Sequence, residues 1–303
     1  MLISVLGASK NLKMKQIIDQ LIYERAPWLA TYSTTTSAVG RTLKACLNYK
    51  TTLEQANRLE CLTGIEILNT VGDEIARQVS ISGLDNVPSS GPALIVANHP
   101  TGIADAIILH NAIRHKRPDV YFFANSDILR VFPQLNTYIA PVEWRKEKRS
   151  KSKTQTTLKF TKQAMEQNRL GVIFPSGRLA KRVGIKLMER EWMTSAATMA
   201  KKYDVPVIPV HISARNSFLF YIFDLIHPTL RDITLFKETL NKKDFRFHIA
   251  IGQPVEPRSL SDNPKLATSF LKSRVHLLDN DYKEYGKKSS IKSYWKTALK
   301  TVN

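Results

Sequence analysis

Hydrophobic positions along the chain change their spacing near residue 79. Before that point they recur at helical intervals, with Ile18, Leu21 and Ile22 on one stripe. Beyond it, apolar and β-branched residues gather in short, almost continuous runs, as in strands that are covered on both faces. These runs span residues 93–98, 120–125, 170–175, 205–212 and 246–254. The pattern predicts helices before residue 79 and a sheet after it.

Helix-like segments separate several of these runs. They span residues 106–114, 154–168 and 192–203. Because strand and helix alternate, the sequence predicts βαβ units and therefore an α/β fold, with a mostly parallel sheet sandwiched by helices. We expect three regions, which are a helical N-terminal extension (1–78), an α/β core (79–257) and a helical, basic C-terminal tail (258–303).

A polar interruption follows the first predicted strand. In the segment NHPTGIAD, Asp105 lies six positions after His99, a spacing that would point the two side chains about 120° apart on a continuous helix. Pro100 and Gly102 break that helix, so a loop at the carboxyl end of the strand can bring the side chains together. A carboxylate beside an imidazole suits a general base that deprotonates a hydroxyl. The alternative is structural, with Asp105 as the N-cap of the next helix and His99 bonded to a loop carbonyl.

The chain is strongly basic. Its 45 Lys and Arg residues against 26 Asp and Glu residues give a formal net charge of +19, which favours a polyanionic partner, either anionic lipid or nucleic acid. No RNA-recognition, zinc-finger or helix-turn-helix signature accompanies the charge, so a nucleic-acid-binding protein is the second hypothesis. Cys46 and Cys61 lack the spacing of metal ligands, and we expect them to be buried thiols in a reducing compartment.

The C-terminal residues favour lipid over nucleic acid. Lysines recur every four residues, and an apolar stripe that contains Trp295 runs beside them; these lysines are Lys288, Lys292, Lys296 and Lys300. A basic face next to an apolar, tryptophan-bearing face is typical of a helix that lies on anionic lipid, although a helix that packs one face on the core gives the same pattern. The N-terminus carries no charged leader, and the densest apolar run (218–226) is shorter than the roughly 20 residues that span a bilayer. We therefore expect a cytoplasmic protein that binds peripherally to a membrane.

The segment NHPTGIAD resembles the first motif of the glycerolipid and lysophospholipid acyltransferase superfamily, whose usual form is His, four residues and Asp; here five residues intervene. With this longer spacing, the motif resembles that of a hemolysin-like, glycerol-acyltransferase-like branch of the superfamily. Residues 131–144, 171–182 and 205–217 resemble the second, third and fourth motifs in the same order, so the resemblance covers about residues 80–257. The third motif departs from the common pattern because Ser176 stands where a glutamate is usual.

The resemblance implies transfer of a fatty acyl group from acyl-CoA or acyl-carrier protein to a hydroxyl of a lysophospholipid or glycerol phosphate. It implies His99 as the base, Asp105 as the residue that holds its ring, and neither a cofactor nor a metal. An amine acceptor, such as the amino group of ornithine, is chemically possible with the same base. A hydrolytic or non-catalytic relative is a further alternative.

The resemblance also implies a surface that binds the acceptor. Its members are Trp144, Arg145, Gly177, Arg178, Lys181 and Arg182. Guanidinium groups after a buried strand can bind phosphate oxygens in pairs, and a solvated basic turn is the alternative. Beyond the fourth motif, Asn216, Phe220 and Tyr221 belong either to an apolar surface for an acyl chain or bilayer, or to the core.

Overall fold

The computed structural model describes residues 2–25, 27, 45, 48–143, 148–179, 181–183 and 186–279; the side chains of residues 2–11, 181–188, 228 and 236 are not part of that description. Trp144, Arg145 and the lysine-rich stretch from residue 280 to the C-terminus lie outside the described residues. Cys46 lies outside them too. Cys61 is exposed, so the expectation that it is a buried thiol is wrong.

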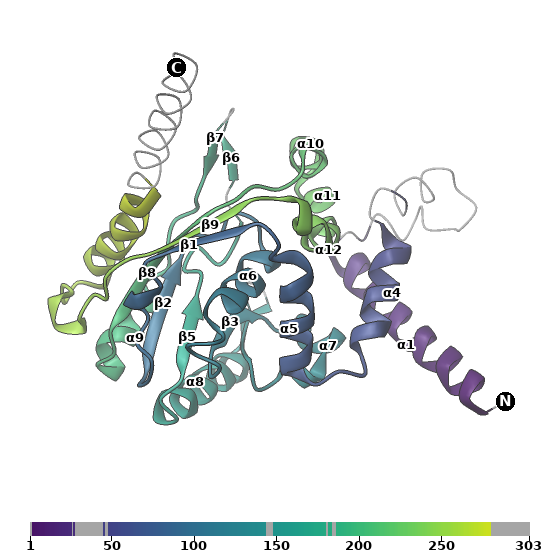
Figure 1. Ribbon diagram of the computed structural model, residues 1–303, viewed down its shortest axis with the longest axis horizontal. Helices are drawn as coiled ribbons and strands as arrows, with labels where there is room; N and C mark the ends of the chain where they lie inside the picture. The colour runs from purple at the N-terminus through teal and green to yellow at the C-terminus, as the bar shows by residue number, and fades with distance from the viewer. Residues whose placement is uncertain are drawn as a thin grey trace, which may run out of the picture.

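A seven-stranded sheet with the order β1-β9-β8-β2-β5-β3-β4 forms the centre of the molecule (Figure 1). Its strands are β1 (Val79–Ser82), β2 (Ala93–Ala97), β3 (Tyr121–Asn125), β4 (Ile139–Val142), β5 (Leu170–Ile173), β8 (Val207–Ser213) and β9 (Phe247–Ile251). Every pairing is parallel except that of β8 with β9. The predicted mostly parallel sheet is confirmed, and so are the five strands that the apolar runs predicted.

The central strands are buried on both sides because each face of the sheet carries its own core. On β2, Ile95 packs in the core beneath α5 (Gly64–Ile75) and α6 (Ile103–Ile113). Its neighbour Val96 points the other way, into the core formed with α9 (Ser195–Tyr203). Alternating side chains therefore serve two layers of helices, which explains the continuous apolar runs in the sequence.

Further helices complete the two layers. On the face of α9 lie α8 (Lys151–Glu166) and a helix over residues 264–279, which supplies Ala267, Leu271 and Val275 to the same core. On the other face, α1 (Leu2–Arg25) and α4 (Tyr49–Leu59) contact each other and share the core of α5 and α6. In Figure 1 these two N-terminal helices lie at the opposite end of the molecule from helix 264–279.

Short elements connect the longer strands and helices. They are α7 (Ile128–Val131), α10 (Phe218–Ile226), α11 (Pro228–Ile233) and α12 (Leu235–Leu240), together with a hairpin of β6 (Lys181–Val183) and β7 (Lys186–Met188) and the 3₁₀ turns η1 (Leu84–Asn86), η2 (Pro133–Leu135), η4 (Asn241–Asp244) and η5 (Pro257–Ser259). In the part of the chain that the structure describes, no helix is long and apolar enough to cross a membrane.

Candidate active site

The loop after β2 is fixed to the neighbouring strand before it reaches His99. The side-chain amide of Asn98 donates to the carbonyl oxygen of Ile212 at 2.9 Å, and its oxygen accepts from the Ile212 backbone N–H at 2.7 Å. Both bonds are buried. They tie the ends of β2 and β8 together and so hold the backbone immediately before His99.

Helix α6 begins after a sharp turn at Gly102, whose φ is 93°. A Cβ added there would lie 3.2 Å from Leu179 and 3.3 Å from Leu235, in a backbone conformation that other residues rarely adopt. Glycine therefore lets the chain turn tightly against two neighbouring segments. The helix starts two residues before Asp105, so the interpretation of Asp105 as its N-cap is wrong.

Asp105 occupies the third position of α6 and is fully buried. Its carboxylate accepts hydrogen bonds from the backbone N–H of Thr101 at 2.9 Å, from that of Gly102 at 3.0 Å, and from the Thr101 hydroxyl. A carboxylate in the first turn also interacts favourably with the helix dipole. These interactions hold the carboxylate in one position beneath the loop.

His99 lies against this carboxylate. Its Nδ1 is 3.0 Å from Oδ2 of Asp105, and its ring stacks on Phe174 with centroids 4.2 Å apart. Nδ1 is buried and makes no hydrogen bond to a described residue, so its approach to Oδ2 is an electrostatic contact. The side chain as a whole is 18% exposed. With a proton on Nδ1 facing the carboxylate, Nε2 keeps a lone pair for a substrate proton. The loop thus brings together the two residues that the sequence pairs.

A buried ion pair lies near Asp105. Lys242 and Glu238 are fully buried and 2.9 Å apart, and Glu238 also accepts from the backbone N–H of Ser217 at 2.8 Å. Burial lowers the pKa of Lys242, while Glu238 and Asp105 oppose that shift. The positive charge of Lys242 therefore partly balances the two buried carboxylates.

Another acidic side chain near the site is that of Glu189, the residue that directly follows β7. It is almost completely buried, and its carboxylate lies 3.5 Å from Nε2 of His276. Burial raises its pKa, while Trp192, Lys272 and His99 oppose this shift only in part. Sequence reasoning did not single out Glu189, which the sequence marks merely as an acid after the basic hairpin segment.

Arginines gather beside the same loop. Arg178 follows Gly177, which has a φ of 61°, and Ser176 donates its hydroxyl to the Arg178 carbonyl at 2.9 Å. Burial lowers the pKa of Arg190, and the positive charges of Arg178 and Arg231 lower it further. Arg231 is paired with Asp224 at 2.8 Å and Asp232 at 2.7 Å. Arg190 and Arg231 are also residues that sequence reasoning did not single out.

A cavity of about 1740 Å³ adjoins these groups and draws lining residues from both faces of the sheet. His99, Glu143 and Phe174 line it just past the carboxyl ends of β2, β4 and β5, and Asn125 lines it as the last residue of β3. Open α/β sheets bind ligands at this edge. One part is apolar, with walls from α1, α4, α5, α6 and the α7–η2 segment; its lining includes Ile18, Leu59, Leu68, Ile107, Phe132 and Leu135. Another part is basic and includes Arg149, Arg178, Arg190, Arg231, Lys265 and Lys272.

The structure brings some of the predicted site residues to the cavity, and others lie outside the described part of the chain. His99, Gly177 and Arg178 line the cavity, and Asp105 lies buried against His99. The backbones of Lys181 and Arg182 form part of β6, but their side chains lie outside the described part of the chain, as do Trp144 and Arg145 altogether.

The three residues beyond the fourth motif have different environments. Phe220 is buried, which fits the core interpretation, and the hydroxyl of Tyr221 accepts from the backbone N–H of Asn216 at 3.2 Å. The side-chain amide of Asn216 is buried. Among the described residues no group of three or more His, Cys, Asp or Glu side chains could hold a metal ion.

Part of the chain matches a known protein family. Residues 78–213 match the protein family described as Acyltransferase, a stretch that contains His99, Asp105 and Arg178. The lyso-glycine lipid O-acyltransferase of Phocaeicola vulgatus is 25% identical over 224 residues, covering 71% of this chain and 78% of that protein. The enzyme of the same name from Bacteroides thetaiotaomicron is 22% identical, covering 71% of this chain and 80% of that protein.

A solved structure, the 1-acyl-sn-glycerophosphate acyltransferase of Thermotoga maritima, aligns with 91% of this chain and 96% of that chain, at 16% identity and a TM-score of 0.44. The family match and the two O-acyltransferases give the sequence resemblance an independent basis. Residues 78–213 therefore form an acyltransferase domain, and the chain is similar to two O-acyltransferases over 71% of its length.

Proposed function

We propose that the protein transfers a fatty acyl group from an acyl thioester to the hydroxyl of a lysolipid. The observation that carries the proposal is the pairing of His99 with the buried Asp105 at the edge of a large, partly apolar cavity. Acylation of an anionic lipid needs a base for the hydroxyl proton, an apolar space for the hydrocarbon chain and cations for the headgroup.

In the proposed reaction Nε2 of His99 accepts the proton of the acceptor hydroxyl as its oxygen attacks the thioester carbonyl. The tetrahedral intermediate then collapses, the carbon–sulfur bond breaks, and the imidazolium returns the proton to the departing thiolate. Asp105 holds Nδ1–H and stabilises the positive ring while it exists, as the aspartate does in Ser-His-Asp systems. The reaction balances without an added oxidant, reductant or metal.

The apolar part of the cavity suits the hydrocarbon chains. The cavity as a whole, at about 1740 Å³, exceeds the roughly 300–1,000 Å³ common for small-ligand pockets. Side chains such as Leu59, Ile107 and Phe132 would exchange water for methylene groups, and each buried methylene stabilises binding by about 0.8 kcal/mol. We therefore assign this part to an acyl chain of donor or acceptor.

The basic part suits an anionic headgroup. The mutual repulsion that lowers the pKa of Arg190 near Arg178 and Arg231 is relieved when a carboxylate or phosphate enters. We include Gly177, Lys181, Arg182, Trp144 and Arg145 in the acceptor site on the family resemblance.

Two classes of acceptor satisfy this chemistry. A lysophospholipid or glycerol phosphate would present a phosphate, and an amino-acid lysolipid would present a carboxylate. The names of the two curated relatives favour the amino-acid class, with transfer to oxygen rather than to an amine. The proposed donor is acyl-CoA or acyl-carrier protein. We propose that the protein acts on the cytoplasmic face of a membrane, with the basic C-terminal residues on anionic lipid.

The proposal is tested by incubating the purified protein with acyl-CoA or acyl-carrier protein and a panel of acceptors. The panel contains lysophosphatidic acid, glycerol phosphate, a lyso-glycine lipid and a lyso-ornithine lipid, and mass spectrometry identifies ester and amide products. We expect an ester with at least one lysolipid. Thioester consumption that is equal with and without every acceptor would make the protein a hydrolase.

A further inference from the structure

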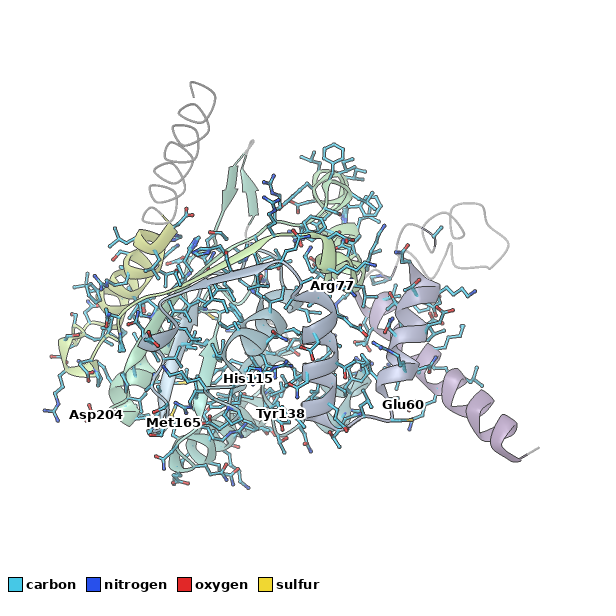
Figure 2. The ribbon with its side chains drawn as sticks, in the orientation of Figure 1. Glu60, Arg77, His115, Tyr138, Met165 and Asp204 are labelled. Carbon is cyan, nitrogen blue, oxygen red and sulfur yellow. The ribbon has the colours of Figure 1, made fainter. Side chains whose placement is uncertain are left out.

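Helix α10 presents a large apolar surface to its surroundings. Phe218 is 80% exposed, Leu225 is 68% exposed and Ile226 is 64% exposed, the highest values among the large hydrophobic residues of the described chain. Phe218, Ile222 and Leu225 are spaced four and three residues apart, so they lie along one stripe of the helix. Figure 2 shows side chains standing out from the outer side of this helix.

The opposite side of α10 is firmly attached to the protein. Phe220 is buried, Ser217 caps the helix by accepting from the Phe220 backbone N–H at 3.3 Å, and Asp224 pairs with Arg231 of α11 at 2.8 Å. The Ser217 hydroxyl also donates to the buried carboxylate of Glu238. The exposed stripe is therefore the outer face of an ordered, two-sided helix, and its exposure costs solvation free energy unless something covers it.

The position of α10 links it to the active site. It packs against α11, and α11 and α12 supply Arg231 and Leu235 to the lining of the cavity. Figure 1 shows α10 above α11 and α12, on the side of the molecule to which the β6–β7 hairpin also projects. A surface that covered α10 would lie next to the basic part of the cavity.

The charges around α10 select the kind of surface. Between residues 213 and 231 the sequence has a single acid, Asp224, whose carboxylate pairs with Arg231 rather than lying on the exposed stripe. Arg215 is exposed just before the helix, and the strands of the hairpin carry three basic residues and no acidic one. An apolar stripe with basic flanks fits the interface of an anionic bilayer.

We propose that α10 is a membrane-docking element that inserts Phe218, Ile222 and Leu225 into the headgroup and acyl boundary of an anionic bilayer, so that the cavity opens toward lipid. This inference rests on the proposed function for its purpose, because a lysolipid substrate resides in a bilayer. The docking itself does not depend on which acceptor is acylated.

The test measures binding of the full chain to vesicles of phosphatidylglycerol and phosphatidylcholine in equal amounts. The double variant Phe218→Ser, Leu225→Ser should bind with a partition coefficient at least about tenfold lower, since each inserted side chain contributes apolar burial. The matched control Ile81→Ser changes an exposed apolar residue of β1 and should bind like the wild type. The variant Leu266→Ser, Phe270→Ser tests the rival apolar stripe on helix 264–279.

Insertion is read directly with Phe218→Trp and lipids brominated in their acyl chains. Quenching of the added emission on bound protein, taken as the difference from the wild type, supports the proposal. An introduced tryptophan that stays unquenched overturns it, as does unchanged binding of the α10 double variant or a loss confined to the helix 264–279 variant. Concentration-dependent dimerisation that the α10 variant abolishes would assign the stripe to a second copy and equally overturn it.

The activity assay separates this inference from the proposed function. If the protein acylates no lysolipid but the introduced tryptophan is quenched, docking stands and the proposed function fails. With a short-chain acceptor dissolved in water, the α10 double variant should retain wild-type activity, whereas with vesicle-embedded acceptor it should lose activity in step with binding. If the α10 double variant kept wild-type activity on the vesicle-embedded acceptor as well, a role for α10 in access to lipid would be refuted.

Discussion

Replacing Asp105 by asparagine should slow acyl transfer without unfolding the protein. In the structure Oδ2 receives the backbone N–H groups of Thr101 and Gly102 and faces Nδ1 of His99, whereas Oδ1 receives the Thr101 hydroxyl. The oxygen of the substituted amide could take the place of Oδ2. Its NH₂ would then face the Thr101 hydroxyl, which can rotate to accept. The geometry is preserved and the negative charge is lost.

The magnitude follows from that charge. Hydrogen bonds to charged groups stabilise by about 1.5–3 kcal/mol, against about 0.5–1.5 kcal/mol for neutral pairs. Loss of the carboxylate partner of the developing imidazolium should therefore raise the barrier by about 1–2 kcal/mol, the difference between the two ranges, which lowers kcat by about 5- to 30-fold. Asp105→Ala should instead destabilise the fold strongly, because it leaves two buried backbone donors without an acceptor.

The assay combines steady-state ester formation with thermal unfolding followed by circular dichroism. Asp73→Asn serves as the control, because Asp73 is an exposed carboxylate that pairs with Arg114 away from the site. The control should keep the wild-type kcat. A folded Asp105→Asn protein with the wild-type kcat would refute the reasoning, since the buried charge would then contribute nothing to the reaction.

Three further predictions concern single groups. Burial lowers the pKa of His110 to about 4, so the folded state resists its protonation and the free energy of unfolding should fall by about 2 kcal/mol between neutral pH and about pH 5. Denaturant titrations at the two pH values should show a smaller loss of stability for His110→Gln. Burial raises the pKa of Glu189, so the free energy of unfolding should fall as pH rises above about 4, where the unfolded chain releases this proton first. Glu189→Gln should therefore gain stability relative to the wild type toward pH 7, and a less stable variant at pH 7 would contradict this sign. If Arg178 binds the acceptor headgroup, Arg178→Lys should raise KM for the acceptor about tenfold or more with the KM for the donor unchanged, because an ammonium lacks the two-pronged geometry of a guanidinium; an unchanged acceptor KM would leave Arg178 as a surface group.

The sequence predicts best the elements whose pattern reflects burial on both sides. Strands such as β2 and β5 read as continuous apolar runs because helices cover both faces. β4 escaped prediction because it has only four residues and contains Pro141, and β1 because serines alternate with apolar residues on a largely exposed edge. A short or exposed strand is defined by its partner in the sheet, which local pattern does not reveal.

The site divides in the same way. The meeting of His99 and Asp105 could be predicted from the Pro and Gly residues between them, because the contact is local. The start of α6 was misplaced, since Gly102 and the bonds to Thr101 set it rather than an N-cap at Asp105. Glu189 could not be predicted, because it comes within reach of the His99 loop only after the β6–β7 hairpin returns the chain from a position about ninety residues away.

The central claim is that His99 is the base of an acyl transfer, and the rate of ester formation by His99→Ala tests it most directly. Purified wild type and variant are compared at saturating acyl thioester and lysolipid, with circular dichroism to establish that both are folded. The account predicts that His99→Ala lowers kcat by about 10²–10⁴-fold, the usual contribution of a general base. A folded His99→Ala protein that forms the ester at the wild-type rate would contradict it.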